Sequence, residues 1–171
     1  MGARKIPGQR PSVTPVWSGA CPSGQAIVGI DMLDLSRSSI AIPPHLRAVR
    51  YNAGHFPGAP GVLGVEGGAN CQQYAYAVLR HHGFVLPDLR SDELWQDRDY
   101  TAEAERMEPF DLVLVHDNPD SWGAHVGLCV GADLVLHLSS RIGVPAIETI
   151  GDLQRRQAYR YLIGCKRPLR R

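Results

Sequence analysis

One cysteine and two histidines have the types and the spacing that nucleophilic catalysis requires. Cys71 begins a helical pattern in the stretch GANCQQYAYAVLRHHG, residues 68–83, and His125 and His137 lie twelve residues apart in a predicted hairpin. An imidazole beside a thiol can take the thiol proton as a general base and later return a proton to the leaving group. A lone cysteine or histidine is more often a buried structural residue. The combination of the three predicts an acyl-transfer site.

The helix that carries Cys71 is expected to place the thiol in its first turn, facing the body of the protein. Asn70 is a favourable N-cap residue, and Gly83 suits the position just after the last turn. Apolar residues follow Cys71 at helical spacing: Tyr74, Ala75, Val78 and Leu79. A thiol at a helix N-terminus beside an imidazole should have a pKa below its reference value of about 8.5.

The relation between the two histidines depends on the loop of the predicted hairpin around Gly131. A three-residue loop, 130–132, pairs Cys129 with Asp133 and His125 with His137, which puts both imidazoles side by side on one face. A two-residue loop puts them on opposite faces. If the histidine face is the one that the Cys71 helix covers, Cys71, His125 and His137 form a line.

The order of the predicted elements indicates the fold class. We expect a short helix within 42–54, a loop over 53–68, the Cys71 helix and a short helix at 91–97. Strands follow after 111, within 124–139 around Gly131 and Ala132, from 147, and over 158–165, with a short helix at 150–156. Helices that precede an antiparallel sheet predict an α+β fold with the N-terminal helices packed on the sheet. Residues 1–40 are expected to be an N-terminal arm or extension, and 41–171 one catalytic domain.

Composition excludes several classes of partner. With 18 basic and 17 acidic residues and a net charge of +1, the chain has no electrostatic footprint for nucleic acid or for a membrane surface. No apolar run is long enough to span a membrane, and no signal peptide is recognised, so a cytoplasmic location or delivery by another route is expected. The four cysteines, Cys21, Cys71, Cys129 and Cys165, lie far apart with no C-x-x-C motif. We therefore expect neither a metal site nor a cofactor.

Several stretches together resemble the NlpC/P60 cysteine peptidases. They are Asn70-Cys71-Gln72-Gln73, the strand start PFDLV (109–113), HVGLCVG (125–131) and the polar His137, within about residues 42–145. The resemblance implies a papain-like fold in which Cys71 is the nucleophile, His125 the base and His137 the residue that orients the base. The Asn-Cys stretch is also similar to lecithin:retinol acyltransferase relatives, whose histidines precede the cysteine, so the chain order favours NlpC/P60.

Three further residues are predicted to contact substrate. The stretch YNAGHF matches the family's Tyr-x-x-Gly pattern ahead of the cysteine, which makes Tyr51 a candidate near the oxyanion, although the gap of 20 residues to Cys71 is long. Asn70 replaces the usual aspartate, and Gln72 and Gln73 replace Ser-Gly. Because Asn70 and Gln72 flank the nucleophile, they are expected to set a substrate preference different from the family's.

The resemblance implies an amide hydrolase that acts through a thioester. Its substrate would be a small peptide or amide, such as a cell-wall muropeptide with a γ-D-glutamyl-diamino acid bond. One alternative is an acyltransferase or amidase of small-molecule metabolism that uses the same Cys-His-His site. The other is a catalytically inactive binding domain of the same fold.

Overall fold

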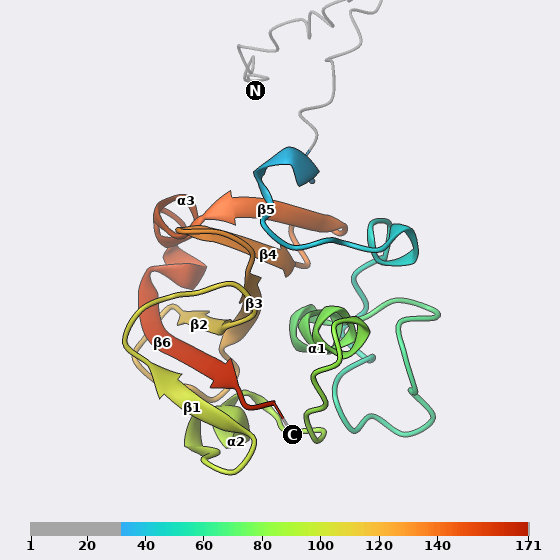
Figure 1. Cartoon of the computed structure of the whole chain (residues 1–171), viewed down its shortest axis with the longest axis horizontal. Coiled ribbons are helices and arrows are strands. Elements are labelled where there is room, and N and C mark those ends of the chain that lie inside the picture. Colours follow the sequence, from blue (N-terminus) through green and yellow to red (C-terminus); the bar gives the residue numbers. More distant parts are fainter. Residues whose placement is uncertain (1–31, 171) are drawn as a thin grey trace, which may run out of the picture.

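The computed structural model describes residues 32–170, which form one six-stranded antiparallel sheet with short helices on both of its faces (Figure 1). The strands are β1 (Thr101–Ala104), β2 (Leu112–His116), β3 (His125–Cys129), β4 (Leu134–Leu138), β5 (Pro145–Thr149) and β6 (Tyr161–Pro168). The α-helices are α1 (Cys71–His81), α2 (Ser91–Gln96) and α3 (Ile150–Gln154), and the 3₁₀ turns are η1 (Leu35–Arg37), η2 (Pro44–Leu46) and η3 (Gln157–Tyr159). The predicted α+β class is confirmed.

The sheet has the strand order β1-β6-β2-β3-β4-β5, so β3 with His125 and β4 with His137 lie next to each other. Consecutive strands β2, β3, β4 and β5 pair as a meander, and β6 returns between β1 and β2. Polar residues on β3, β4 and β5 can therefore meet across the sheet although they are far apart in sequence.

Helix α1 packs against one face of the sheet and forms the main core with it. Its ends match the predicted caps, because the Asn70 side chain accepts the N–H of Gln73 at 2.8 Å and Gly83 has a φ of 84°. Buried α1 residues and inward-facing strand residues share this core: Tyr74, Ala75, Val78, Leu79, Leu112, Leu114, Val126, Leu128, Leu136 and Leu138. The core fixes the first turn of α1, and with it Cys71, against β3 and β4.

A second, smaller cluster covers the opposite face, beneath α3 and η3. Its members alternate along the strands with those of the main core: Val113, Val115, Cys129, Val135, Leu153, Tyr159 and Cys165. Figure 1 shows α1 and α3 on opposite sides of the strands. The sheet is therefore buried on both faces, which explains the nearly continuous apolar runs in its central strands.

Two of the predicted elements differ from the structure. The helix expected within 42–54 is only the 3₁₀ turn η2, because the chain then extends so that Tyr51 can bridge to Ala69. The edge strand β1 was not predicted, since a four-residue strand made only of polar or small residues carries little pattern. The strands at the hairpin, after 111, near 147 and at the C-terminal end, and the short helices α2 and α3, are confirmed.

The described part of the N-terminal region joins the sheet. Ser39 donates its backbone N–H to the Val130 carbonyl at 2.6 Å, and Ile147 donates its N–H to the Met32 carbonyl at 2.8 Å. The boundary predicted at residue 40 stays a prediction. The predicted arm over residues 1–15, most of the element predicted over 25–35, and Cys21 lie outside the described residues. Over residues 32–170, no helix has the length and apolar character needed to cross a membrane.

Candidate active site

Cys71 occupies the first position of α1, as predicted, and its thiol contacts β3. The backbone N–H of Val126 bonds to the Cys71 thiol, as do N–H groups of the first helical turn. Burial nevertheless raises the pKa of the Cys71 thiol, and these N–H groups and the charge of Arg90 only partly offset that effect. The expected lowering of the Cys71 pKa is therefore wrong for the protein without substrate, because desolvation outweighs the helix terminus.

His125 and His137 are in contact, although not by the predicted register. Leu128 pairs with Leu136 and Cys129 with Val135, and the turn comprises the three residues 131–133 rather than 130–132. Each pairing is thus shifted by two positions from the prediction. A register shift of two residues leaves each side chain on the same face of the sheet. The imidazoles are therefore diagonal neighbours, with His125 Nε2 at 3.1 Å from His137 Nδ1.

The histidines lie on the face opposite α1, which corrects the expectation of a single line on the helix-covered face. They share their face with Cys129 and Val135, beneath η3, where the Tyr159 ring stacks on His125 with centroids 4.6 Å apart. The pairing of β3 with β4 includes Leu128 and Cys129 and does not extend to His125. The strands therefore separate at the end of β3 that holds His125, where the Cys71 thiol bonds to the adjacent Val126.

Tyr159 links the thiol to the histidine face. Burial raises the pKa of Tyr159, and the nearby Cys71 thiolate raises it further. The Tyr159 ring also stacks on His125, so Tyr159 interacts with the thiol through its charge and with the imidazole through ring contact. Sequence reasoning missed Tyr159, because nothing in QRRQAYRY indicates that this tyrosine folds back over β3.

Glu148 and Arg156 extend the polar cluster, and sequence reasoning missed both. His137 Nε2 lies 2.8 Å from Glu148 Oε2, and the Arg156 guanidinium bonds to both carboxylate oxygens. His137 is buried, with 1% of its surface exposed, and Glu148 is mostly buried. An acidic residue within the apolar strand PAIET was the available signal, since a buried carboxylate needs a partner. Its pairing with β4 was not predictable from local sequence.

The basicity of His125 reflects all of these neighbours. Burial lowers the pKa of His125 well below 6.5, and the positive charge that His137 and Arg156 can carry lowers it further, whereas Glu148 raises it. With the Cys71 pKa raised and the His125 pKa lowered, the resting pair is a neutral thiol and a neutral imidazole. Such a pair acts by general-base removal of the thiol proton during attack, not as a preformed ion pair.

Tyr51 lies near Cys71 because the chain between them closes on itself. Tyr51 forms a parallel bridge with Ala69: Asn52 donates its N–H to the Ala69 carbonyl and Ala69 donates its N–H to the Arg50 carbonyl, which brings both ends of the 53–68 loop together. Burial and then the Cys71 thiolate raise the pKa of Tyr51. The gap of 20 residues is thus compatible with the predicted position of Tyr51 beside the thiol, and its contact with substrate stays a prediction.

The residues that flank the thiol have structural contacts. Asn70 caps α1, and its N–H donates to the His55 carbonyl at 2.7 Å. Gln72 is buried, and its side-chain N–H groups donate to the Tyr76 hydroxyl at 3.0 Å and the Leu89 carbonyl at 2.9 Å. These bonds orient the first turn of α1. The substrate contacts predicted for Asn70 and Gln72 stay predictions.

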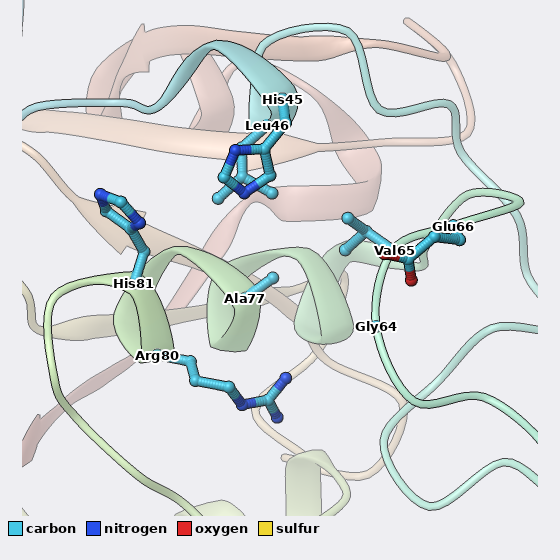
Figure 2. A pocket seen from close by; sticks show the side chains of 8 residues that line it. All are labelled: His45, Leu46, Gly64, Val65, Glu66, Ala77, Arg80 and His81. Atoms are coloured by element: carbon cyan, nitrogen blue, oxygen red, sulfur yellow. The ribbon is translucent and has the colours of Figure 1, made fainter.

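Two pockets lie beside helices, one at the start of α2 and the other at α1. One, of about 330 Å³, is lined by Arg90, Ser91, Asp92, Glu93, Trp122 and Gly123. Arg90 also lowers the pKa of Cys71 through its charge, but Cys71, His125 and His137 do not line this pocket. The other, of about 260 Å³, lies between η2, the 64–66 segment and α1 (Figure 2). Cys71, His125 and His137 do not line this second pocket.

Metal binding has no support from the geometry of residues 32–170. Within that range no three His, Cys, Asp or Glu side chains are placed to hold a metal ion. The polar cluster of His125, His137 and Glu148 is instead a hydrogen-bonded row on three adjacent strands.

Comparisons with known proteins give a distant structural neighbour. No protein-family model matches the chain, and no curated protein matches it. Among solved structures, the chain is similar to an NlpC/P60 family protein from Bacillus cereus ATCC 10987, with a TM-score of 0.46 and 15% sequence identity. The match covers 61% of this chain and 32% of that one, so it spans about a third of the neighbour. A likeness at this level assigns no family.

Proposed function

We propose that the protein is a cysteine-dependent amide hydrolase in which Cys71 is the nucleophile and His125 the general base. The observation that carries the proposal is the bond from the Val126 N–H to the Cys71 thiol, because it places the nucleophile beside the strand residue that follows His125. The buried His125–His137 contact supports it, since a base needs a partner that fixes its ring.

The proposed reaction has two halves. In the first, the Cys71 sulfur attacks the carbonyl carbon of the amide while His125 accepts the thiol proton, which gives a tetrahedral intermediate with an oxyanion. N–H groups of the first turn of α1, whose dipole favours negative charge, are suited to stabilise that oxyanion. The intermediate collapses as the C–N bond breaks and His125 donates the proton to the leaving amine, which leaves a thioester on Cys71.

In the second half, water replaces the amine. His125, again neutral, removes a proton from the water as its oxygen attacks the thioester carbonyl. The C–S bond breaks, the carboxylic acid leaves, and the proton on His125 returns to the sulfur. An amine or alcohol in place of water would give the acyltransferase alternative with the same residues. The inactive binding domain is disfavoured because a buried His-His-Glu row is costly to maintain without use.

The proposed substrate is a muropeptide with a γ-D-glutamyl-diamino acid bond, as the motif resemblance implies. Such a peptide carries carboxylates, and the positive charge of Arg90, which lowers the pKa of Cys71 and lines the pocket at the start of α2, suits an anionic substrate.

Digestion of purified muropeptides, followed by mass spectrometry, tests the substrate. We expect cleavage at the γ-D-glutamyl bond by the wild-type protein and none by the Cys71→Ala variant. Cleavage that persists in Cys71→Ala would contradict the role of Cys71. Intact muropeptides with the wild-type protein would contradict the substrate and leave the chemistry of Cys71 to be tested with other acyl donors.

A further inference from the structure

The polar row on the sheet continues beyond the two histidines to a charged pair. His125 on β3, His137 on β4 and Glu148 on β5 are linked by contacts of 3.1 and 2.8 Å, and Arg156, just after α3, bonds to both oxygens of Glu148. The two histidines and Glu148 come from three different strands, so the tertiary fold brings them together, and Arg156 joins them from the segment between α3 and η3. Both nitrogens of His137 are occupied, one by His125 and the other by Glu148.

The charge state of Glu148 determines where the protons of the row lie. The hydrogen bond with His137 lowers the pKa of Glu148 to about 2, so its carboxylate is ionised and can only accept hydrogen bonds. His137 Nε2 must then donate to Glu148. In the neutral form of His137, which has a single N–H, Nδ1 accepts, and the donor to it is His125 Nε2. Nδ1 of His125 is then the nitrogen left without a proton.

We propose that Glu148 and Arg156 are positioning residues that set this proton order in His137 and His125, so that His125 presents an unprotonated Nδ1 as the base of the site. Arg156 holds both carboxylate oxygens and thereby fixes which oxygen faces His137. The use of Nδ1 as a base rests on the proposed function, whereas the proton order itself does not.

Other charged or titratable groups also face the row, and they do not change the proton order in His137 and His125. Tyr159 of η3 stacks on His125, Cys71 of α1 acts on Tyr159, and Asp152 of α3 acts on Arg156. Glu148 raises the pKa of His125, whereas Arg156 lowers it, so the two charges have opposite effects on the protonation of His125. Their main effect is therefore on orientation and tautomer and less on the charge of His125.

Glu148→Gln changes the proton order in a defined way. Arg156 offers only donors, so it should attract the amide oxygen and turn the amide NH₂ toward His137. His137 Nε2 would then accept, its Nδ1 would carry the proton, and His125 would be protonated on Nδ1. The base would thus be blocked with almost no change in side-chain volume. Arg156→Lys keeps the cation and the ionised carboxylate, and it should retain the wild-type order.

Nitrogen-15 NMR of the histidine rings, assigned with His125→Gln and His137→Gln variants, reads this order without any substrate. In the wild-type protein at pH 7 we expect both rings to be protonated on Nε2 only. In Glu148→Gln we expect a shift to Nδ1 protonation. A matched control is Glu103→Gln, which makes the same change at the exposed Glu103–Arg98 pair. That control should leave both rings as in the wild-type protein.

Two results would overturn the proposal. One is a wild-type His137 that carries a proton on Nδ1, and the other is a Glu148→Gln spectrum with unchanged tautomers. If Glu148→Gln does not fold, the spectra of the wild-type protein and of Arg156→Lys still test the proton order.

Hydrolysis of p-nitrophenyl acetate adds a second readout. We expect kcat about 100-fold lower in Glu148→Gln with KM nearly unchanged, and recovery in Arg156→Lys. The predicted tautomers in a wild-type protein without hydrolysis would contradict the proposed function and uphold the proton order.

Discussion

At the scale of residues, the candidate site combines an uncharged Cys71 thiol with an uncharged His125 imidazole. Burial raises the pKa of Cys71 and lowers that of His125, so neither group is charged in the resting protein. A preformed ion pair, by contrast, would need the opposite shifts. We therefore expect the reactivity of Cys71 to depend on its position and on a base with a free nitrogen, more than on a thiolate that is present before substrate binds.

Alkylation by iodoacetamide tests this description of Cys71. Burial raises the pKa of both Cys129 and Cys165 to about 11, and both are buried, whereas Cys71 is partly exposed. We expect Cys71 to react fastest of these three at pH 7, and its rate to rise continuously up to pH 9 as the thiolate fraction grows. Trypsin should release the four cysteines in separate peptides, with Cys71 in 51–80, so mass spectrometry can follow each one. A rate that is constant between pH 5 and 8 would indicate an ion pair instead.

The stability of the protein should depend on Glu148 in acid. Its pKa of about 2 in the folded state is below the ordinary value of 4.5, so the carboxylate stabilises the fold above pH 4.5 and loses that contribution as the pH falls toward 2. The shift corresponds to at most about 3 kcal/mol, and solvent screening reduces it. Urea unfolding from pH 2.5 to 7 should show a shallower loss in Glu148→Gln than in the wild-type protein. Equal slopes would contradict the paired state of Glu148.

At the scale of elements, the site depends on how α1 and the preceding loop are joined. The 53–68 loop leaves after Tyr51 and returns at Ala69, two residues before Cys71. Gly68 allows this return, because its φ of 103° is in a region that favours glycine and a Cβ there would lie 2.6 Å from the Arg50 carbonyl oxygen. The close approach of the two segments therefore requires glycine at this position.

Gly68→Ala should destabilise the protein and disturb the position of Tyr51. We expect a loss of about 2–4 kcal/mol in the free energy of unfolding, from backbone strain together with the clash. Gly61→Ala is the matched control, because Gly61 also has a positive φ, 77°, but a Cβ there would meet nothing within 4 Å. This control should cost about 1 kcal/mol. Equal losses in the two variants, measured by urea unfolding, would contradict a specific close approach at Gly68.

Much of the element pattern could be predicted from the sequence, because it depends on local chemistry. Asn70, Gly83 and the apolar spacing between them gave the limits of α1 correctly, and the glycine at 131 indicated the hairpin. The register of that hairpin was wrong by two, because the strands alone do not determine which three residues form the turn. The helix expected within 42–54 failed because Tyr51 pairs with Ala69, a tertiary contact that overrides local propensity.

At the scale of the whole molecule, the candidate site takes its residues from both faces of a sheet that is buried on each face. Cys71 begins the helix on one face, whereas His125, His137 and Glu148 lie on the other. The bond from the Val126 N–H to the Cys71 thiol places the thiol beside the strand residue that follows His125. Cys71, His125 and His137 could be named from the sequence. Glu148, Arg156 and Tyr159 could not, because strand order and the fold of the C-terminal segment bring them to the site.

Acylation of Cys71 tests most directly the proposal that Cys71 is the nucleophile. The probe is p-nitrophenyl acetate, which does not depend on the natural substrate. After an acid quench, we expect the acetyl group on the 51–80 peptide of the wild-type protein, together with continued release of nitrophenolate. Both should be lost in Cys71→Ser and strongly reduced in His125→Ala. Acetylation spread equally over the other cysteine peptides, or turnover that persists in Cys71→Ser, would contradict Cys71 as the nucleophile.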